Sequence, residues 1–352
     1  SLIAPSLRTS EVQHAVKKNI SCWAGGIRLF SYLCMISHAI IFRVWRTLYN
    51  LGKKMESICI RSCYCVAGQV FEVDFCGVSP SVGCLSSFEP FKTERVSVDL
   101  LFLLKVNASD FYPREEPLPK ITDFSVDGVS YLISGLPGGG YQYRLTEEKN
   151  PGTDCYLESN ADFSKVCVCL GGSALLQNYA LSNFIMMAYA FSAATKGTLL
   201  MHASVIAHGG RGYLFLGKSG TGKSTHSRLW LEHISDTELL NDDNPVVRVE
   251  GSAVTVYGSP WSGKTPCYKN KSVPVGAFVR LRQKPENEIS GCVDALAYAS
   301  LVPSVSNMMW DDRVNDGICS SVSAIATLCR VYVLGCLPDK EAAFLCHDTV
   351  VK

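Results

Sequence analysis

The sequence predicts a mixed α/β protein in which a β-rich region, residues 55–172, precedes an α/β domain, residues 173–352. In the first region, short runs of valine, aromatic and β-branched residues alternate with Gly, Pro, Asn and Asp clusters, as strands alternate with turns. From residue 197 onward the pattern becomes strand, loop, helix and strand, which is typical of layered α/β domains. An apolar stretch over residues 173–195 separates the two patterns.

The bulk composition describes a globular chain. Of its 352 residues, 47% are hydrophobic and 18% are charged, which favours a sizeable core and argues against disorder. The formal net charge of +1 carries no sign of a nucleic-acid partner. The 16 cysteines are scattered and lack the paired spacing of a zinc site, so we expect reduced thiols in a cytoplasmic protein.

The first 54 residues differ from the rest. They hold eight Lys or Arg and one acidic residue, Glu11, whereas the remainder is net acidic. Their apolar segment, residues 29–42, is shorter than the roughly 20 residues that span a bilayer. A membrane-surface helix, an ordinary helix and upstream sequence joined to the true start stay open. We favour the third, with a non-native basic extension before Met55.

The β-rich region contains five clear strand-like runs. The triplet in "LPGGGY", residues 136–141, is predicted to be a turn between strands, because neither a lysine nor a helical pattern follows it. The predicted strands lie in the runs 56–75, 95–106, 124–133, 141–145 and 165–171.

Residues 173–195 predict a long helix, with Ser173 as its cap and Gly197 as its stop. The segment is apolar nearly all round, with a few polar interruptions. It therefore reads as a buried helix and not as a membrane span.

The stretch "GKSGTGKS", residues 217–224 and here called the glycine loop, satisfies the pattern G-x-x-x-x-G-K-[ST]. Glycines let successive amides converge on phosphate oxygens, and the helix that follows points its positive end at the same anion. Lys223 would reach the β- and γ-phosphates of ATP, and the Ser224 hydroxyl would bind Mg²⁺. The predicted nucleotide-binding residues are Gly217, Ser219, Gly220, Thr221, Gly222, Lys223, Ser224 and Thr225.

Two adjacent carboxylates, Asp242 and Asp243, end an apolar run 19 and 20 residues after Lys223. This Asp pair suits a division of labour in which Asp243 helps hold Mg²⁺ and Asp242 takes a proton from an attacking hydroxyl. The surrounding "NDDNP" is also turn chemistry, and that alternative stays open. Arg280 and Arg282 share one strand face, where a bound phosphate or a half-exposed strand explains them equally well.

The spacing of His202, the glycine loop and the Asp pair resembles the catalytic domain of HPr kinase/phosphorylase, whose fold is shared with ATP-dependent phosphoenolpyruvate carboxykinase. The resemblance covers residues 197–283 well and the C-terminal third loosely, and it extends to an uncharacterised bacterial branch with "LNDDNPV" and "GSPWSGK". It implies catalytic roles for Asp242, Lys223 and His202. It also implies self-association, since HPr kinases assemble as hexamers.

The chain departs from this family where an acidic metal-binding stretch is expected. Residues 257–275 contain no acidic residue and offer a cationic loop. This loop would receive an anionic substrate or serve only as a surface turn. The candidate substrate-loop residues are Trp261, Ser262, Gly263 and Lys264.

We therefore predict an ATP- and Mg²⁺-dependent, HPr-kinase-like enzyme that transfers the γ-phosphate to a hydroxyl acceptor, with a protein or peptide as the substrate. Two alternatives stay open. One is an accessory or regulatory protein that binds ATP without turnover, and the other is a kinase for a small metabolite.

Overall fold

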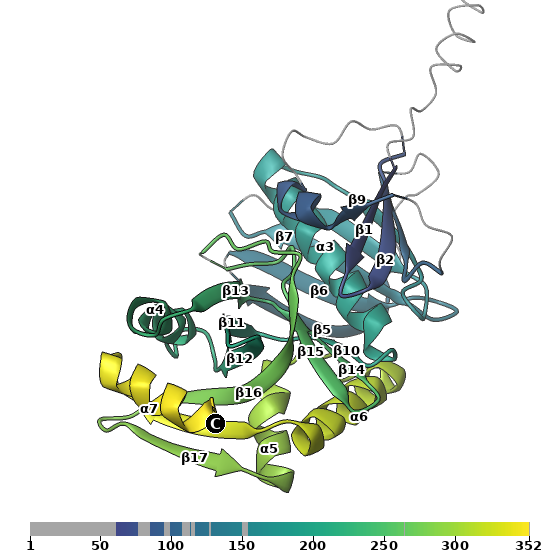
Figure 1. Cartoon of the computed structure of the whole chain (residues 1–352). Coiled ribbons are helices and arrows are strands. Elements are labelled where there is room, and N and C mark those ends of the chain that lie inside the picture. The colour runs from purple at the N-terminus through teal and green to yellow at the C-terminus, as the bar shows by residue number, and fades with distance from the viewer. Residues whose placement is uncertain are drawn as a thin grey trace, which may run out of the picture. The chain divides into compact units, whose positions relative to one another are not determined.

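The computed structural model describes residues 61–76, 85–94, 99–107, 113, 117–126, 128–149, 154–263 and 265–351, which belong to one compact unit. The predictions for residues 1–54, Met55 and Lys264 fall outside these residues. The fold is mixed α/β, with two large mixed sheets and few helices, as the sequence predicted at that level (Figure 1).

The first sheet contains nine strands in the order β3-β1-β2-β4-β9-β8-β7-β6-β5. β4 runs parallel to β2 and β9, and the other neighbours are antiparallel. A 3₁₀ helix, η1 (Ser86–Phe91), precedes β3. The strands are β1 (Arg61–Val66), β2 (Gln69–Asp74), β3 (Lys92–Thr93), β4 (Leu103–Val106), β5 (Lys120–Val126), β6 (Val129–Gly135), β7 (Tyr141–Glu147), β8 (Cys155–Ser159) and β9 (Lys165–Cys169).

Three strand predictions in this region need correction. The run over residues 124–133, predicted as one strand, contains the end of β5 and the start of β6, which pair antiparallel as a hairpin. The run over residues 56–75, predicted as one strand, contains the hairpin β1–β2, because Ala67 and Gly68 adopt φ values of 49° and 74° and reverse the chain. In the run over residues 95–106, only Leu103–Val106 of the described residues form a strand. The predicted turn between β6 and β7 is confirmed, with the amide of Leu136 donating to the Gly140 carbonyl at 3.1 Å.

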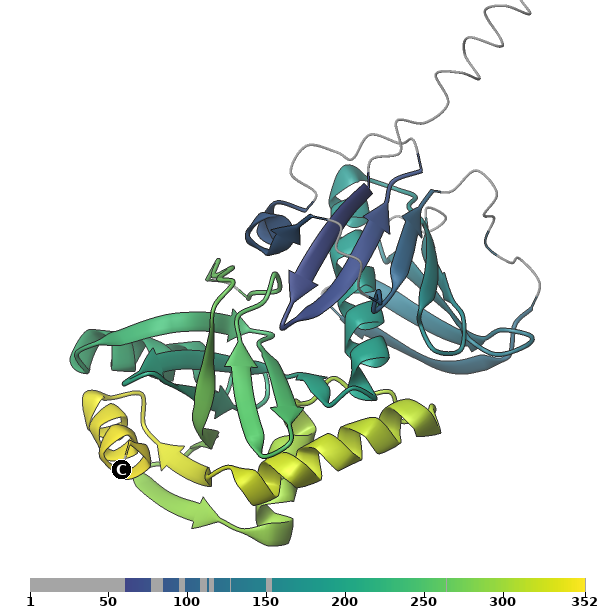
Figure 2. The same ribbon diagram turned by 45° about the vertical axis from the view of Figure 1, so that its right-hand side comes forward.

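The predicted long helix is α3 (Ala174–Ala194). Its cap is confirmed, because the Ser173 hydroxyl accepts a hydrogen bond from the amide of Leu176 at 3.1 Å. The buried Tyr189 hydroxyl donates to the carbonyl of Val66 at 3.0 Å. Apolar residues of α3 and of both sheets form one continuous hydrophobic core. The ribbon of α3 lies alongside strands of the first sheet (Figure 2).

The second sheet also contains nine strands, seven of them in the order β10-β14-β15-β16-β12-β11-β13, while β18 pairs with β16 and β17. β12, β16 and β18 are parallel neighbours. Their carboxyl ends therefore meet at one edge, where open α/β sheets usually bind ligands. The strands are β10 (Thr198–Leu200), β11 (Ala203–His208), β12 (Arg211–Leu216), β13 (Thr237–Asp243), β14 (Val246–Glu250), β15 (Ala253–Tyr257), β16 (Ser272–Gln283), β17 (Glu288–Cys292) and β18 (Val331–Cys336).

The helices after β12 flank this sheet. They are α4 (Lys223–His233), α5 (Asp294–Leu301), α6 (Asp312–Leu328) and α7 (Lys340–Val350), with the 3₁₀ turn η2 (Val302–Ser304) after α5. α4 and α7 share a second apolar cluster with β12 and β16, in which Trp230 is fully buried. Across the described residues, no helix is both long enough and apolar enough to cross a membrane.

Candidate functional site

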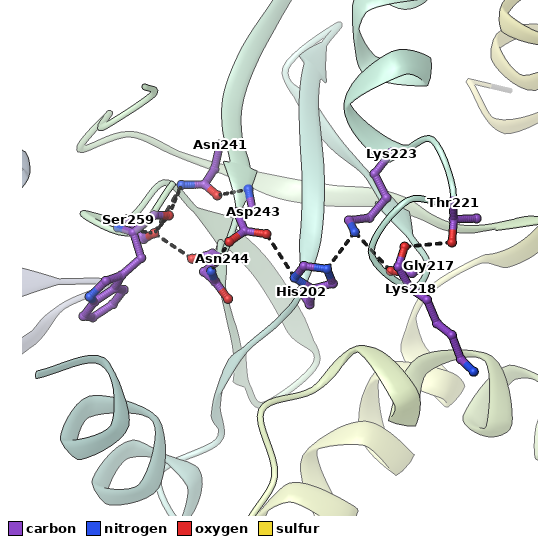
Figure 3. A network of polar contacts seen from close by, with 10 residues as sticks. His202, Gly217, Lys218, Thr221, Lys223, Asn241, Asp243, Asn244 and Ser259 are labelled. Carbon is purple, nitrogen blue, oxygen red and sulfur yellow. Dashed lines mark hydrogen bonds and ion pairs between the residues drawn. The ribbon is translucent and has the colours of Figure 1, made fainter. Parts of the chain in front are cut away.

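The glycine loop connects the buried end of β12 to the first turn of α4. Gly220 and Gly222 adopt φ values of 80° and 109°, which favour glycine. A Cβ atom added at either position would meet no heavy atom within 4 Å, so the space over the loop is open. Thr221 closes the turn, its hydroxyl donating to the Lys218 carbonyl at 2.7 Å (Figure 3). The loop therefore has room for a ligand against its backbone.

Helix α4 begins at the loop without a side-chain cap. Gly222 is its N-cap residue, and its carbonyl accepts the amide of His226 at 2.8 Å. The amides of residues 223–225 precede that first bond, so they have no acceptor within the helix. Ser224 is exposed beside them. The helix start thus presents several donors and a hydroxyl to an anion.

Lys223 is the first residue of α4, and its side chain turns back under the loop. It is only 8% exposed, and its ammonium donates to the Gly217 carbonyl at 3.1 Å and lies 2.7 Å from Nε2 of His202. Burial lowers its pKa, while Asp243 and Asp242 act in the opposite direction. No carboxylate of the described residues forms an ion pair with it. The site therefore holds a largely buried cation without a directly bonded counter-ion.

His202 lies between β10 and β11 and links the loop to the end of β13. Its Nδ1 atom is 3.0 Å from Oδ1 of Asp243, and Nε2 faces Lys223 (Figure 3). An ammonium group can only donate a hydrogen bond, so Nε2 of His202 is the acceptor. Nδ1 therefore carries the ring proton and donates a hydrogen bond to Asp243. Three predicted site residues therefore form one hydrogen-bonded chain.

Asparagine and serine residues that sequence reasoning did not single out brace Asp243. The side-chain amide of Asn244 donates to Oδ2 of Asp243 at 2.6 Å. The backbone amide of Asp243 donates to the side-chain oxygen of Asn241 at 3.0 Å. Asn241 also donates to Ser259, whose hydroxyl donates to the Asn244 carbonyl. The only sequence signal was the "NDDN" run itself, which reads equally well as a turn.

Asp242 and Asp243 are neighbours on β13, so their side chains face opposite sides of the sheet. Asp242 is 4% exposed, and its Oδ1 atom is buried without a hydrogen-bond partner among the described residues. It lines a cavity of about 260 Å³ together with Ser224, Arg228 and Thr265. A buried carboxylate oxygen without a donor is costly, so this oxygen is set to receive a donor or a cation.

The predicted substrate loop divides into buried and accessible parts. Trp261 is 5% exposed and its ring packs against Phe88 and Tyr189, so it belongs to the core and cannot meet a substrate. Ser262 is partly exposed and forms an isolated β-bridge with Asp243. The exposed Gly263 donates its amide to the Asp242 carbonyl at 3.1 Å.

Two more cavities open where β12 and β16 end. One, of about 300 Å³, is lined mainly by apolar residues that include Leu229, Leu281 and Pro338, and also by Thr225, His226, Gln283 and Lys284. The other, of about 490 Å³, lies between loop residues 217–221 and residues 280–283 of β16. The glycine loop thus borders both an apolar space and a polar one.

Comparison with known proteins yields little. No family model matches the chain, and no curated protein matches it. Among solved structures, the HPr(Ser) kinase/phosphatase from Coxiella burnetii aligns with 13% sequence identity and a TM-score of 0.25, over 43% of this chain and 93% of that one.

Proposed function

We propose that the protein binds Mg·ATP at the glycine loop and transfers the γ-phosphate to a hydroxyl acceptor. The observation that carries the proposal is Lys223. A lysine that is 8% exposed and has no carboxylate bonded to its ammonium group, under a loop with open space above it, calls for an anion. A nucleotide triphosphate supplies that charge where the free amides of α4 also converge.

The apolar cavity of about 300 Å³ suits the base of the nucleotide. It begins at Thr225, on the first turn of α4, and continues over Leu229, Leu281 and Pro338. Pockets for ligand rings are lined mainly by apolar groups, with a few polar ones that fix orientation. In this arrangement the phosphates lie along the loop toward Lys223.

The hydroxyl and carboxylate oxygens at this site suit Mg²⁺, because Mg²⁺ prefers oxygen ligands of these kinds. Ser224 and Asp243 are the proposed ligands, and Asp242 lines the same cavity as Ser224. When bound, the metal would neutralise charge on the phosphates during transfer.

The protein's own groups would do the remaining work by position and charge. Lys223 would leave the Gly217 carbonyl and donate to the phosphate that is transferred. Asp242, which lines the cavity beside Ser224, would accept the proton of the acceptor hydroxyl with its carboxylate. His202, fixed by Asp243, would keep Lys223 near the loop in the absence of ligand.

Two measurements on the purified protein test this function. Titration calorimetry should detect ATP binding at millimolar Mg²⁺. ADP release should then rise with one member of a panel of hydroxyl compounds, including free serine, sugars and candidate carrier proteins. Absence of binding heat would sink the proposal. If ATP binds but no member of the panel causes ADP release, the result would favour the accessory alternative.

A further inference from the structure

The cavity of about 490 Å³ beside the glycine loop has a strongly basic lining. Lys218 stands on the loop side, and Arg280 and Arg282 stand on β16. No Asp or Glu is among the described residues that line it. We call it the arginine cavity.

The strand geometry places both arginines on the same side. Residues two apart on a strand face the same way, so Arg280 and Arg282 share one face of β16. Leu281 between them is 3% exposed and belongs to the apolar cluster on the opposite face. The two positive charges are therefore neighbours because of the fold, and not because of a flexible loop.

One of the two guanidinium groups is held in place. Nη1 of Arg280 donates to the Ser300 carbonyl at the end of α5, at 2.9 Å. Burial, and next the charge of Arg282, lower the pKa of Arg280. Like charges at this spacing repel, and no carboxylate of the described residues pairs with either arginine. A bound anion would relieve that repulsion.

The arginine cavity is separate from the Lys223 contact. Lys223 reaches His202, which lies on the β11 side of the loop, and it does not line the cavity. The two places share Gly217, whose carbonyl accepts from Lys223 and whose backbone borders the cavity. An anion in the cavity would therefore lie against loop residues 217–221, along which the phosphates of a bound nucleotide would run.

Building on the proposed function, we infer that Arg280, Arg282 and Lys218 bind the anionic group, a phosphate or a carboxylate, of a small hydroxyl-bearing acceptor. Arg280 is pre-positioned by Ser300, and Arg282 supplies a second fork of donors. The acceptor class is thus a hydroxylated small molecule with one anionic end.

Inorganic phosphate is the probe for this subsite. The protein is first saturated with Mg²⁺ and a non-hydrolysable ATP analogue, so that the glycine loop is filled, and is then titrated with phosphate by calorimetry. The wild type should bind phosphate in this state. The Arg280→Gln, Arg282→Gln double variant should bind it roughly 10–100-fold more weakly, the size expected for losing charge-assisted hydrogen bonds.

Arg211→Gln is the matched control, since it removes the same charge from the amino-terminal end of β12. It should leave phosphate binding unchanged, and all variants should keep the analogue's affinity within about threefold. The single variant Arg282→Gln, at an exposed position, should also weaken phosphate binding. It can replace the double variant in the test if the double variant unfolds.

Equal phosphate affinity in the wild type and the arginine variants would overturn the inference. So would phosphate that competes with the analogue, because the anion would then occupy the nucleotide site. If the analogue does not bind at all, the proposed function fails on its own. Phosphate titration of Lys223→Ala protein, with and without the arginine substitutions, would still test the arginine cavity. Titration with glycerate would show whether a carboxylate binds there as well.

Discussion

Nζ of Lys223 lies 2.7 Å from Nε2 of His202, whose other ring nitrogen lies 3.0 Å from Asp243. A cation, a neutral ring and a carboxylate thus stand in line between the glycine loop and the end of β13. Because the ring accepts from the ammonium and donates to the carboxylate, each group fixes the hydrogen-bonding role of the next. This series of hydrogen bonds explains how a buried lysine is tolerated without a direct ion pair.

Replacing Lys223 with Met should weaken ATP binding without harming the ligand-free fold. The charge-assisted contacts to phosphate are lost, which should weaken ATP by roughly 10–100-fold. The midpoint of thermal unfolding without ligand should not fall, because a buried cation is exchanged for an apolar chain of similar length. Calorimetry and thermal unfolding measure the two effects.

Lys196→Met is the control for this substitution, because Lys196 is exposed and lies outside the glycine loop and the cavities beside it. Its affinity for ATP should stay within about threefold of the wild type. The assignment of Lys223 fails if the two variants exchange these behaviours.

ATP affinity should decrease at alkaline pH, with a midpoint below the ordinary lysine pKa of 10.5. Burial lowers the pKa of Lys223, so the free protein loses this proton earlier than an exposed lysine would. Phosphate binding needs the charged form. Above the lowered pKa, the dissociation constant should rise by up to about tenfold per pH unit.

The same shift has an effect on stability. The folded protein disfavours the charged form of Lys223, so the destabilisation is present below the lowered pKa and disappears as the pH rises through it toward 10.5. Lys223→Arg, which stays charged, should abolish the alkaline loss of ATP affinity. A wild-type profile that is flat up to pH 10 would contradict the buried position of the ammonium.

Asp242→Asn and Asp243→Asn should fail in different ways. Asp242→Asn removes the basic oxygen that lacks a partner, so ADP release should fall by about 10²–10⁴-fold while ATP affinity changes little. Asp243→Asn should chiefly raise the Mg²⁺ concentration needed for half-maximal activity. Steady-state assays across Mg²⁺ concentrations separate the two, and identical profiles would refute the division of labour.

His226 should make the protein sensitive to acid. It is buried in α4, its Nε2 accepts from the Trp230 indole at 3.2 Å, and burial lowers its pKa from 6.5 to about 4. Because the unfolded chain binds this proton more readily, the contribution of His226 to stability should be constant above pH 6.5 and fall between pH 6.5 and 4. The full loss amounts to about 3 kcal/mol.

Urea unfolding at several pH values measures this loss. His226→Gln keeps an acceptor for Trp230 and should flatten the profile between pH 4.5 and 6.5, after other acidic groups are accounted for by difference. His233→Gln, on the same helix and exposed, should leave the slope unchanged. An unchanged slope in His226→Gln would show that another group causes the effect.

Local patterns explain why much of the fold could be predicted. Ser173 with its apolar run predicted α3, and the residues after Gly222 predicted α4, because caps and periodicity act within a few residues. The hairpin at Ala67 and Gly68 was missed, since the "AG" pair is a weak turn signal and the flanking alternation continues on both sides. The substrate-loop interpretation of Trp261 failed for another reason: only packing against Phe88 and Tyr189 shows that its ring is buried.

By itself, the sequence determined the mixed α/β class, the order of strand, glycine loop and helix, and the positions of the charged residues along them. Tertiary structure alone decided which of these charges meet. Lys223 contacts His202 and not a carboxylate, and one oxygen of Asp242 has no hydrogen-bond partner among the described residues. Arg280 lies beside the glycine loop, although the two are about 60 residues apart in the sequence. The physical reason is range: capping and periodicity act over a few residues, whereas burial and charge pairing depend on how strands far apart in the chain align in one sheet.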